Sequence, residues 1–174
     1  MQTTRHVTTQ HITAQHITAQ HIKTQHIQTR MPAVAGLFYP FEASELAQMV
    51  RGFLQEPVTQ DAAGSAPAKM LVVPHAGYIY SGAVAGTAYA QLQNVQQIRR
   101  VVLLGPSHRV ALRGIAAPSV DAFVTPLGEI AIDRDLRAAI ADMPGVLIHD
   151  SPHTQEHSLE VQLPFLQALL QDFT

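Results

Sequence analysis

The sequence contains no cysteine and no tryptophan, and only 14% of its 174 residues are charged. The absence of cysteine excludes disulfide bonds and any site that needs a thiolate from this chain. Charged residues make up about 25% of an average globular domain, so this fraction is low. A formal net charge of −2 argues against a nucleic-acid-binding protein, which needs a basic surface to hold phosphates.

Long hydrophobic runs are also missing. No apolar stretch reaches the roughly 18 residues of a membrane span, and residues 1–30 lack the apolar core of a signal peptide. We therefore expect no membrane segment and a cytoplasmic location.

Residues 6–30 consist of five pentapeptide repeats that each begin with histidine. A five-residue step turns a helix by about 140°, so the isoleucines form no stripe along it. In a strand, the odd period places successive isoleucines on opposite faces. A four-sided β-solenoid could use this period, but five repeats supply little more than one coil. The sequence therefore predicts a disordered, low-complexity tail over residues 1–30 and a folded domain over residues 31–174, with Met31 as an alternative start.

The first half of the predicted domain contains two helical patterns and two apolar runs. Apolar residues at i, i+3 and i+4 spacing predict a helix over residues 44–54, with Ser44 as its N-cap. Residues 70–73 and 101–104 are continuous apolar runs, typical of strands buried on both faces. A predicted helix over residues 81–93, closely packed through its glycines, separates them. This order indicates a βαβ unit with parallel strands and a right-handed crossover.

The second half contains shorter predicted elements. They are strands over residues 114–117, 122–125, 129–132 and 146–148, and helices over residues 133–143 and 155–173, the last kinked at Pro164. The pattern predicts an α/β domain with a mainly parallel or mixed sheet. The sequence ends inside an apolar helix without a cap, so we expect a domain that is incomplete at its C-terminus.

Two histidines follow the two predicted parallel strands. His75 lies two residues after the first strand and His108 four residues after the second, so both should lie at the carboxyl edge of the sheet. Neighbouring strands are about 4.8 Å apart, which allows both imidazoles to reach one point. Two imidazoles form half of a site for iron, zinc or copper. Alternatively, each histidine forms only a hydrogen bond within its loop.

A third cluster contains His153, His157 and Glu160. If a helix has begun by His153, the i, i+4 and i, i+3 spacings place all three side chains on one face. A carboxylate beside a histidine can hold its tautomer or act as a general base. We therefore regard His157 and Glu160 as candidate catalytic residues. The alternative is an ordinary polar helix N-terminus, where the helix dipole favours acidic residues.

Five ordered motifs resemble the Memo family, whose bacterial members are called AmmeMemoRadiSam system protein B. The motifs occupy residues 32–40 (PAVAGLFYP), 73–82 (VPHAGYIYSG), 104–108 (LGPSH), 120–128 and 156–165 (EHSLEVQLPF). The resemblance runs from about Met31 to the last residue. It implies a three-layer α/β/α fold related to the class III extradiol dioxygenases, which use non-haem iron, and a pocket that resembles their active site.

By this resemblance, His75 and His108 would bind a metal ion, iron or copper, and His157 and Glu160 would lie near the pocket. The family implies an AMMECR-type protein and a radical-SAM enzyme as partners. Its members continue with a further C-terminal part that contributes a cysteine as the third metal ligand. Because this chain has no cysteine, the resemblance predicts a chain that is cut short and an open, weak site.

Hypotheses of different kinds follow from these patterns. The first is a metal-dependent, dioxygenase-like oxidoreductase in its complete form. The second is a non-catalytic module that binds a peptide or protein segment in the same pocket. The third is a remnant without activity, for which open sheet edges predict poor solubility or oligomers of residues 31–174.

Overall fold

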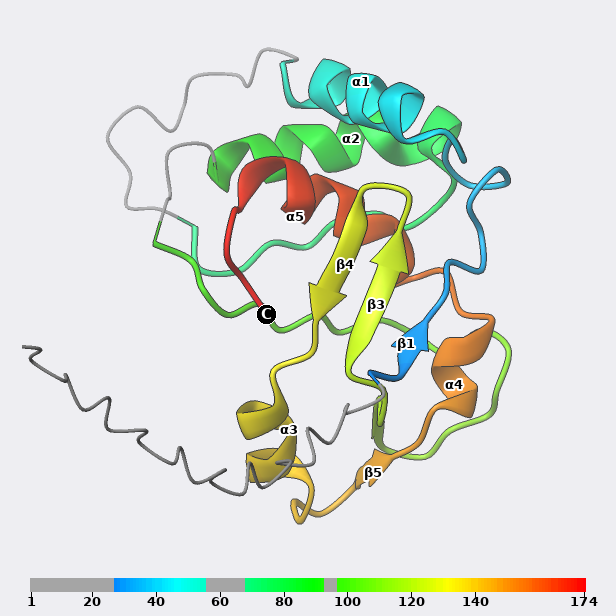
Figure 1. Cartoon of the computed structure of the whole chain (residues 1–174), viewed down its shortest axis with the longest axis vertical. Helices are drawn as coiled ribbons and strands as arrows, with labels where there is room; N and C mark the ends of the chain where they lie inside the picture. Colours follow the sequence, from blue (N-terminus) through cyan, green and yellow to red (C-terminus); the bar gives the residue numbers. More distant parts are fainter. Residues whose placement is uncertain (1–26, 56–67, 93–96) are drawn as a thin grey trace, which may run out of the picture.

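The structure, a computed structural model, describes residues 27–55, 68–92 and 97–174 (Figure 1). Most of the predicted tail, residues 1–26, therefore lies outside the described residues. The helices are α1 (Ala43–Leu54), α2 (Tyr78–Tyr89), α3 (Arg134–Ile140), α4 (Ser151–Thr154) and α5 (Leu163–Leu169), with the short 3-10 helices η1 (Ala90–Leu92) and η2 (Glu160–Gln162). The strands are β1 (Thr29–Arg30), β2 (Ile115–Ala117), β3 (Ala122–Thr125), β4 (Gly128–Ala131) and β5 (Val146–Ile148). No helix among these residues is long and apolar enough to cross a membrane.

The strands form two small sheets. In the first, β3 lies between β1, its parallel partner, and β4, its antiparallel partner. In the second, β2 and β5 are parallel. The predicted positions of these four short strands after residue 110 are confirmed to within a residue. Helices together with a mixed sheet and a parallel sheet confirm an α/β protein.

Helix α1 buries the apolar face that its spacing predicted, with Leu46, Val50 and Leu54 in the core. It begins one residue earlier than expected, and Glu42 is its N-cap, so the predicted cap at Ser44 was wrong. Tyr89 of α2 stacks on Phe165 of α5 with ring centroids 4.9 Å apart. The main core thus lies between α1, α2 and α5, which group together in Figure 1.

The close approach of α1 and α2 depends on two glycines. A Cβ atom added at Gly82 would lie 2.3 Å from the Phe53 ring, and one at Gly86 would lie 2.5 Å from the Phe53 carbonyl oxygen. Both contacts are too short for any larger residue. This confirms the prediction that the helix packs closely through its glycines, although α2 begins earlier than the predicted residue 81.

The predicted βαβ unit was wrong. Residues 70–73 and 101–104 belong to no strand in the described chain, and no strand pairing joins them. Both runs line a groove of about 590 Å³ instead. Their side chains also alternate: Leu71 and Val73 pack against the core, whereas Val72 is 93% exposed. The runs are therefore not buried on both faces.

The long helix predicted over residues 155–173 was also wrong. Within these residues the chain instead forms only η2 and α5, and the preceding α4 is a separate short helix. Pro152 and Pro164 each lie in the first turn of a helix. Proline lacks an N–H that the first turn does not need, so each proline is accommodated where a new helix begins. Pro164 therefore lies in the first turn of α5 rather than kinking a longer helix.

The folded part begins before Met31. Strand β1 comes from the last pentapeptide repeat and pairs with β3. Asp121 N donates to Gln28 O at 2.7 Å, next to this pairing. Arg30 is buried, and its guanidinium lies over the Phe123 ring with 5.2 Å between Cζ and the ring centroid. Residues 27–30 thus belong to the folded domain rather than to the tail.

Candidate metal centre

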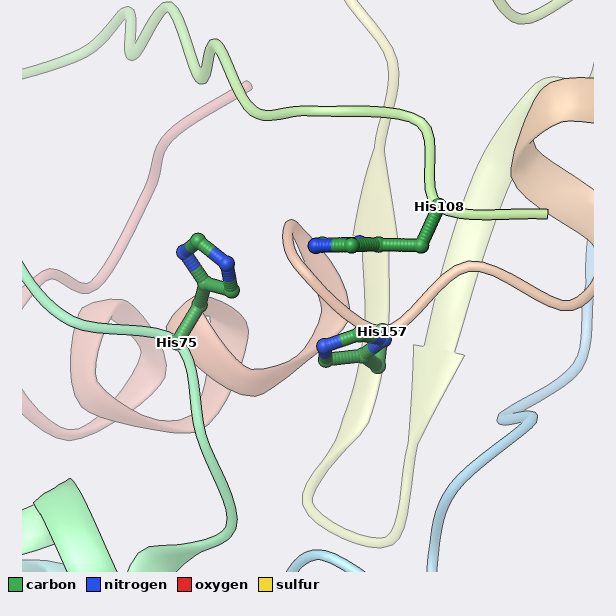
Figure 2. A group of neighbouring side chains, drawn as sticks. All are labelled: His75, His108 and His157. Carbon is green, nitrogen blue, oxygen red and sulfur yellow. The ribbon is translucent and has the colours of Figure 1, made fainter. Parts of the chain in front are cut away.

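Three histidines from distant parts of the chain converge in one place (Figure 2). His75 precedes α2, His108 follows the 101–104 run, and His157 lies between α4 and η2. The ring centroid of His75 lies 5.3 Å from that of His108 and 5.7 Å from that of His157. The rings of His108 and His157 stack at 4.6 Å with 25° between their planes. One nitrogen of each ring lies within 4.8 Å of the other two, which defines the histidine cluster His75, His108 and His157.

The loop that carries His108 is hydrogen-bonded to the segment that carries His157. Ser158 Oγ donates to Pro106 O at 2.9 Å. A Cβ atom added at Gly105 would lie 2.8 Å from Ser158 Oγ, so the two loops approach too closely for a side chain at this position. These contacts bring two of the three rings together.

Hydrogen bonds to two other segments, one around Phe38 and one at η2, hold the loop that carries His75. Gln162 Nε2 donates to Pro74 O at 3.0 Å, immediately before His75. Tyr78 N donates to Phe38 O at 2.7 Å, and Tyr78 Oη donates to Val161 O at 2.8 Å. Hydrogen bonds therefore position the histidines, rather than the strand pairing that the sequence predicted.

Glu156 is the charged group closest to the cluster, and the sequence interpretation missed it as a site residue. Its Oε2 accepts from His108 N at 2.6 Å, and its Oε1 faces His108 Nδ1 at 2.9 Å. Burial by itself would raise the pKa of Glu156, but hydrogen bonds from His108, Ser158 and His157 outweigh it and lower the pKa to about 2. Its position next to His157 was the available signal, because a carboxylate beside a ligand histidine is a common arrangement.

His157 sits deeper than His108, with 18% of its side chain exposed compared with 40%. Its ring packs on Phe38 with centroids 4.7 Å apart. Burial lowers the pKa of His157, and the nearby Glu156 carboxylate only partly opposes this effect. A neutral imidazole near pH 7 has a free lone pair, which metal binding requires.

Glu160 faces a different part of the molecule. Its side chain is fully buried and forms an ion pair with Arg30. It also accepts from Ala33 N at 2.8 Å, Val34 N at 3.0 Å and Tyr39 Oη at 2.5 Å. These four donors define the Arg30–Glu160 network. A carboxylate enclosed in this way supports the fold, and the predicted catalytic role of Glu160 stays a prediction.

His153 also lies apart from the cluster. It is buried, and its Nε2 lies 3.1 Å from Ala116 O. The predicted common helix face for His153, His157 and Glu160 was wrong because these residues belong to separate short pieces of chain. The three side chains contact a carbonyl of β2, the histidine cluster and the Arg30–Glu160 network respectively.

A comparison with known proteins identifies the family of this chain. Residues 30–174 match the family described as Memo-like protein. The chain belongs to the Memo-like family. This confirms the resemblance drawn from the five sequence motifs. The match begins at Arg30, the residue that anchors β1 in this Memo-like fold.

Several relatives of this Memo-like chain are MEMO1 family proteins. The one from Aquifex aeolicus is 43% identical over 141 residues, which cover 79% of this chain and 49% of the relative. The one from Methanopyrus kandleri is 40% identical over 146 residues, which cover 79% and 51%. The one from Ignicoccus hospitalis is 38% identical over 153 residues, which cover 82% and 53%. The chain spans about half the length of these curated relatives.

Proposed function

We propose that His75, His108 and His157 bind one transition-metal ion. The observation that carries this proposal is the position of one nitrogen of each ring within 4.8 Å of the other two. Two nitrogens that bind one ion at about 2.1 Å lie at most about 4.2 Å apart. Small ring rotations would therefore close the cluster around an ion. Three neutral imidazoles suit iron, copper or zinc.

His157 takes a place in this proposal that the sequence did not predict. The motifs pointed to His75 and His108 as ligands and to His157 as catalytic, whereas the geometry supports His157 as a third ligand. A third imidazole from within the chain would strengthen the site that two histidines alone leave weak. The resemblance to class III dioxygenases supports iron as the ion.

Three ligands leave coordination positions open for a substrate. A bound metal would supply Lewis acidity there, and in the case of iron also redox chemistry. The protein would contribute orientation, because backbone and side-chain hydrogen bonds hold the loops of all three histidines. Glu156 would place a negative charge beside the ligands. We propose a metal-dependent, dioxygenase-like pocket within a three-layer fold, with the substrate left open.

The family resemblance also supports two partners. We propose an AMMECR-type protein and a radical-SAM enzyme as partners of the complete protein. The chain spans about half of its relatives, so both proposals concern the longer family member.

Metal binding can be tested on the full chain by titration calorimetry with Fe(II) under anaerobic conditions. The histidines of the repeats would bind metal by themselves, so all variants carry asparagine in place of His6, His11, His16, His21 and His26. We expect one ion per chain, and at least a tenfold loss of affinity on replacing any one cluster histidine with alanine. The matched control is His149→Ala, at an exposed histidine outside the cluster. Equal affinity in the control and in the triple cluster variant would refute the metal centre.

A further inference from the structure

We propose that Glu156 is a positioning residue that keeps the ring hydrogens of His108 and His157 on Nδ1 and thereby directs both Nε2 atoms into the histidine cluster. Its Oε1 lies 2.9 Å from His108 Nδ1 and 3.2 Å from His157 Nδ1. An ionised carboxylate only accepts hydrogen bonds, so a neutral ring beside it carries its hydrogen on the facing nitrogen. The consequence for metal affinity rests on the proposed metal centre, whereas the tautomers do not.

The carboxylate is itself held in one orientation. It accepts from three backbone N–H groups, those of His108 at 2.6 Å, His157 at 2.9 Å and Ser158 at 2.9 Å. Only 5% of the Glu156 side chain is exposed. Rotation away from the rings would break all three bonds in a nearly closed space. The acceptor is therefore fixed before any metal arrives.

The rings point in the direction that this arrangement requires. In Figure 2, the stacked rings of His108 and His157 each turn one nitrogen toward His75. With a hydrogen on Nδ1, the nitrogens facing the centre carry lone pairs. The opposite tautomer would place two N–H groups there, and a cation would be repelled.

His75 differs from the other two histidines. No hydrogen bond joins its ring to any residue that the structure describes, and its ring contacts are with the two other imidazoles. The cluster therefore consists of one ring that is hydrogen-bonded to Glu156, a second ring whose Nδ1 lies 3.2 Å from the same carboxylate, and a third ring without a hydrogen bond to the described residues. This asymmetry places the expected adjustment on metal binding at His75.

The tautomers can be measured directly by long-range proton–nitrogen NMR on the metal-free full chain, with the five repeat histidines replaced by asparagine. The spectra are recorded near pH 8, above the ordinary histidine pKa of about 6.5. We expect the Nδ1–H form for His108 and His157. His153 serves as an internal reference with the opposite form, because its Nε2 faces the carbonyl of Ala116. An Nε2–H form at either His108 or His157 overturns the proposal.

Variants separate positioning from support of the fold. Glu156→Ala removes the acceptor, and we expect His108 to shift to the Nε2–H form and the affinity for Fe(II) to fall 10–100-fold. Glu156→Gln keeps an oxygen acceptor, so it should retain the Nδ1–H form and part of the affinity. Glu129→Ala, at an exposed position of β4, is the matched control and should change neither.

The outcomes are distinguishable. If Glu156→Ala lowers the melting temperature while the tautomers stay unchanged, the role is structural and the positioning proposal is overturned. If Glu156→Ala fails to fold, the tautomers of His108 and His157 in the chain that retains Glu156 and in the Glu156→Gln variant still test the proposal. If the tautomers are as expected but the chain binds no Fe(II), positioning stands and the metal centre fails.

Discussion

Glu156 and Glu160 are four residues apart, but their carboxylates contact different parts of the protein. Glu156 lies beside the histidine cluster, where its carboxylate contacts the rings of His108 and His157. Glu160 lies in the interior, where it is paired with Arg30 and enclosed by backbone N–H groups. A regular helix would place positions i and i+4 on one face. Because α4 ends before this segment and η2 begins within it, the two carboxylates face different surroundings.

The comparison shows how one chain segment can join a site to the core. The Arg30–Glu160 network ties η2 to β1 and to the loop that precedes α1. Burial raises the pKa of Tyr39 well above its ordinary value, and its hydrogen bond to Glu160 adds to this effect. Tyr39 therefore stays protonated and can donate. Glu160 therefore stabilises the chain segment that also carries Glu156 and the cluster residue His157.

Removing the interior carboxylate should have the largest effect. Glu160→Gln leaves the Arg30 guanidinium buried without its counter-charge, and we expect a loss of about 5 kcal/mol in the free energy of unfolding. Urea denaturation measures this loss. Asp172→Asn is the control, since its ion pair with Arg99 is exposed, and it should cost less than about 0.5 kcal/mol. Equal effects of both substitutions would contradict a dominant role for the interior network.

Removing the partner strand should come next. A chain that begins at Met31 lacks Arg30 and β1, whereas a chain that begins at Ile27 retains them. We expect the shorter chain to be less stable by about 3–4 kcal/mol, because Glu160 keeps its other three donors but loses its counter-charge. Melting and urea curves of the two chains test this difference. Identical curves for the two chains would contradict a contribution of residues 27–30 to the stability of the folded domain.

The carboxylate of Glu156 should contribute to stability in a way that depends on pH. The pKa of Glu156 falls from 4.5 to about 2 on folding. A lowered carboxyl pKa contributes stability above about pH 4.5 that is lost as the pH falls toward 2, at most about 3 kcal/mol. We expect Glu156→Gln to be less stable than the natural chain at pH 7 and to approach it as the pH falls toward 3. A difference that does not change with pH, measured by urea denaturation, would contradict this account.

The smallest effect on the free energy of unfolding should come from His153, which lies in α4 outside the histidine cluster. Burial lowers its pKa below 6.5, although its hydrogen bond to Ala116 partly opposes this. A histidine with a lowered pKa in the folded state loses stability as the pH falls below about 6.5, because the unfolded chain binds the proton first. We expect His153→Gln to remove part of the loss of stability between pH 6.5 and 5.5, measured by urea denaturation at the two pH values. His149→Gln, at an exposed site, should leave the pH dependence unchanged.

The sequence located the candidate metal centre better than it explained it. His75 and His108 converge as the positions after two apolar runs predicted, with ring centroids 5.3 Å apart. The predicted reason, paired parallel strands, was wrong, and hydrogen bonds from Gln162 and Ser158 hold the loops instead. Such side-chain contacts span 52 and 88 residues, and no local pattern encodes them.

The second half of the site depended on an element that the sequence misplaced. Apolar periodicity over residues 155–173 predicted one helix, but residues 155–159 form no helix and Pro164 lies in the first turn of α5. In such a helix Glu156 would be a charge near the N-terminus rather than a partner of His108. The same error placed Glu160 beside the histidines rather than in the interior.

The sequence by itself determined the family, the α/β class, most short strands and two of the three clustered histidines. It did so because motifs, apolar spacing and turn residues are local, and a single chain displays them directly. Tertiary structure alone decided that Arg30 belongs to the fold, that Glu156 and Glu160 face different surroundings, and that His157 completes the cluster. These outcomes depend on which distant groups satisfy buried charges and backbone polar atoms, and only the packed chain brings those groups together.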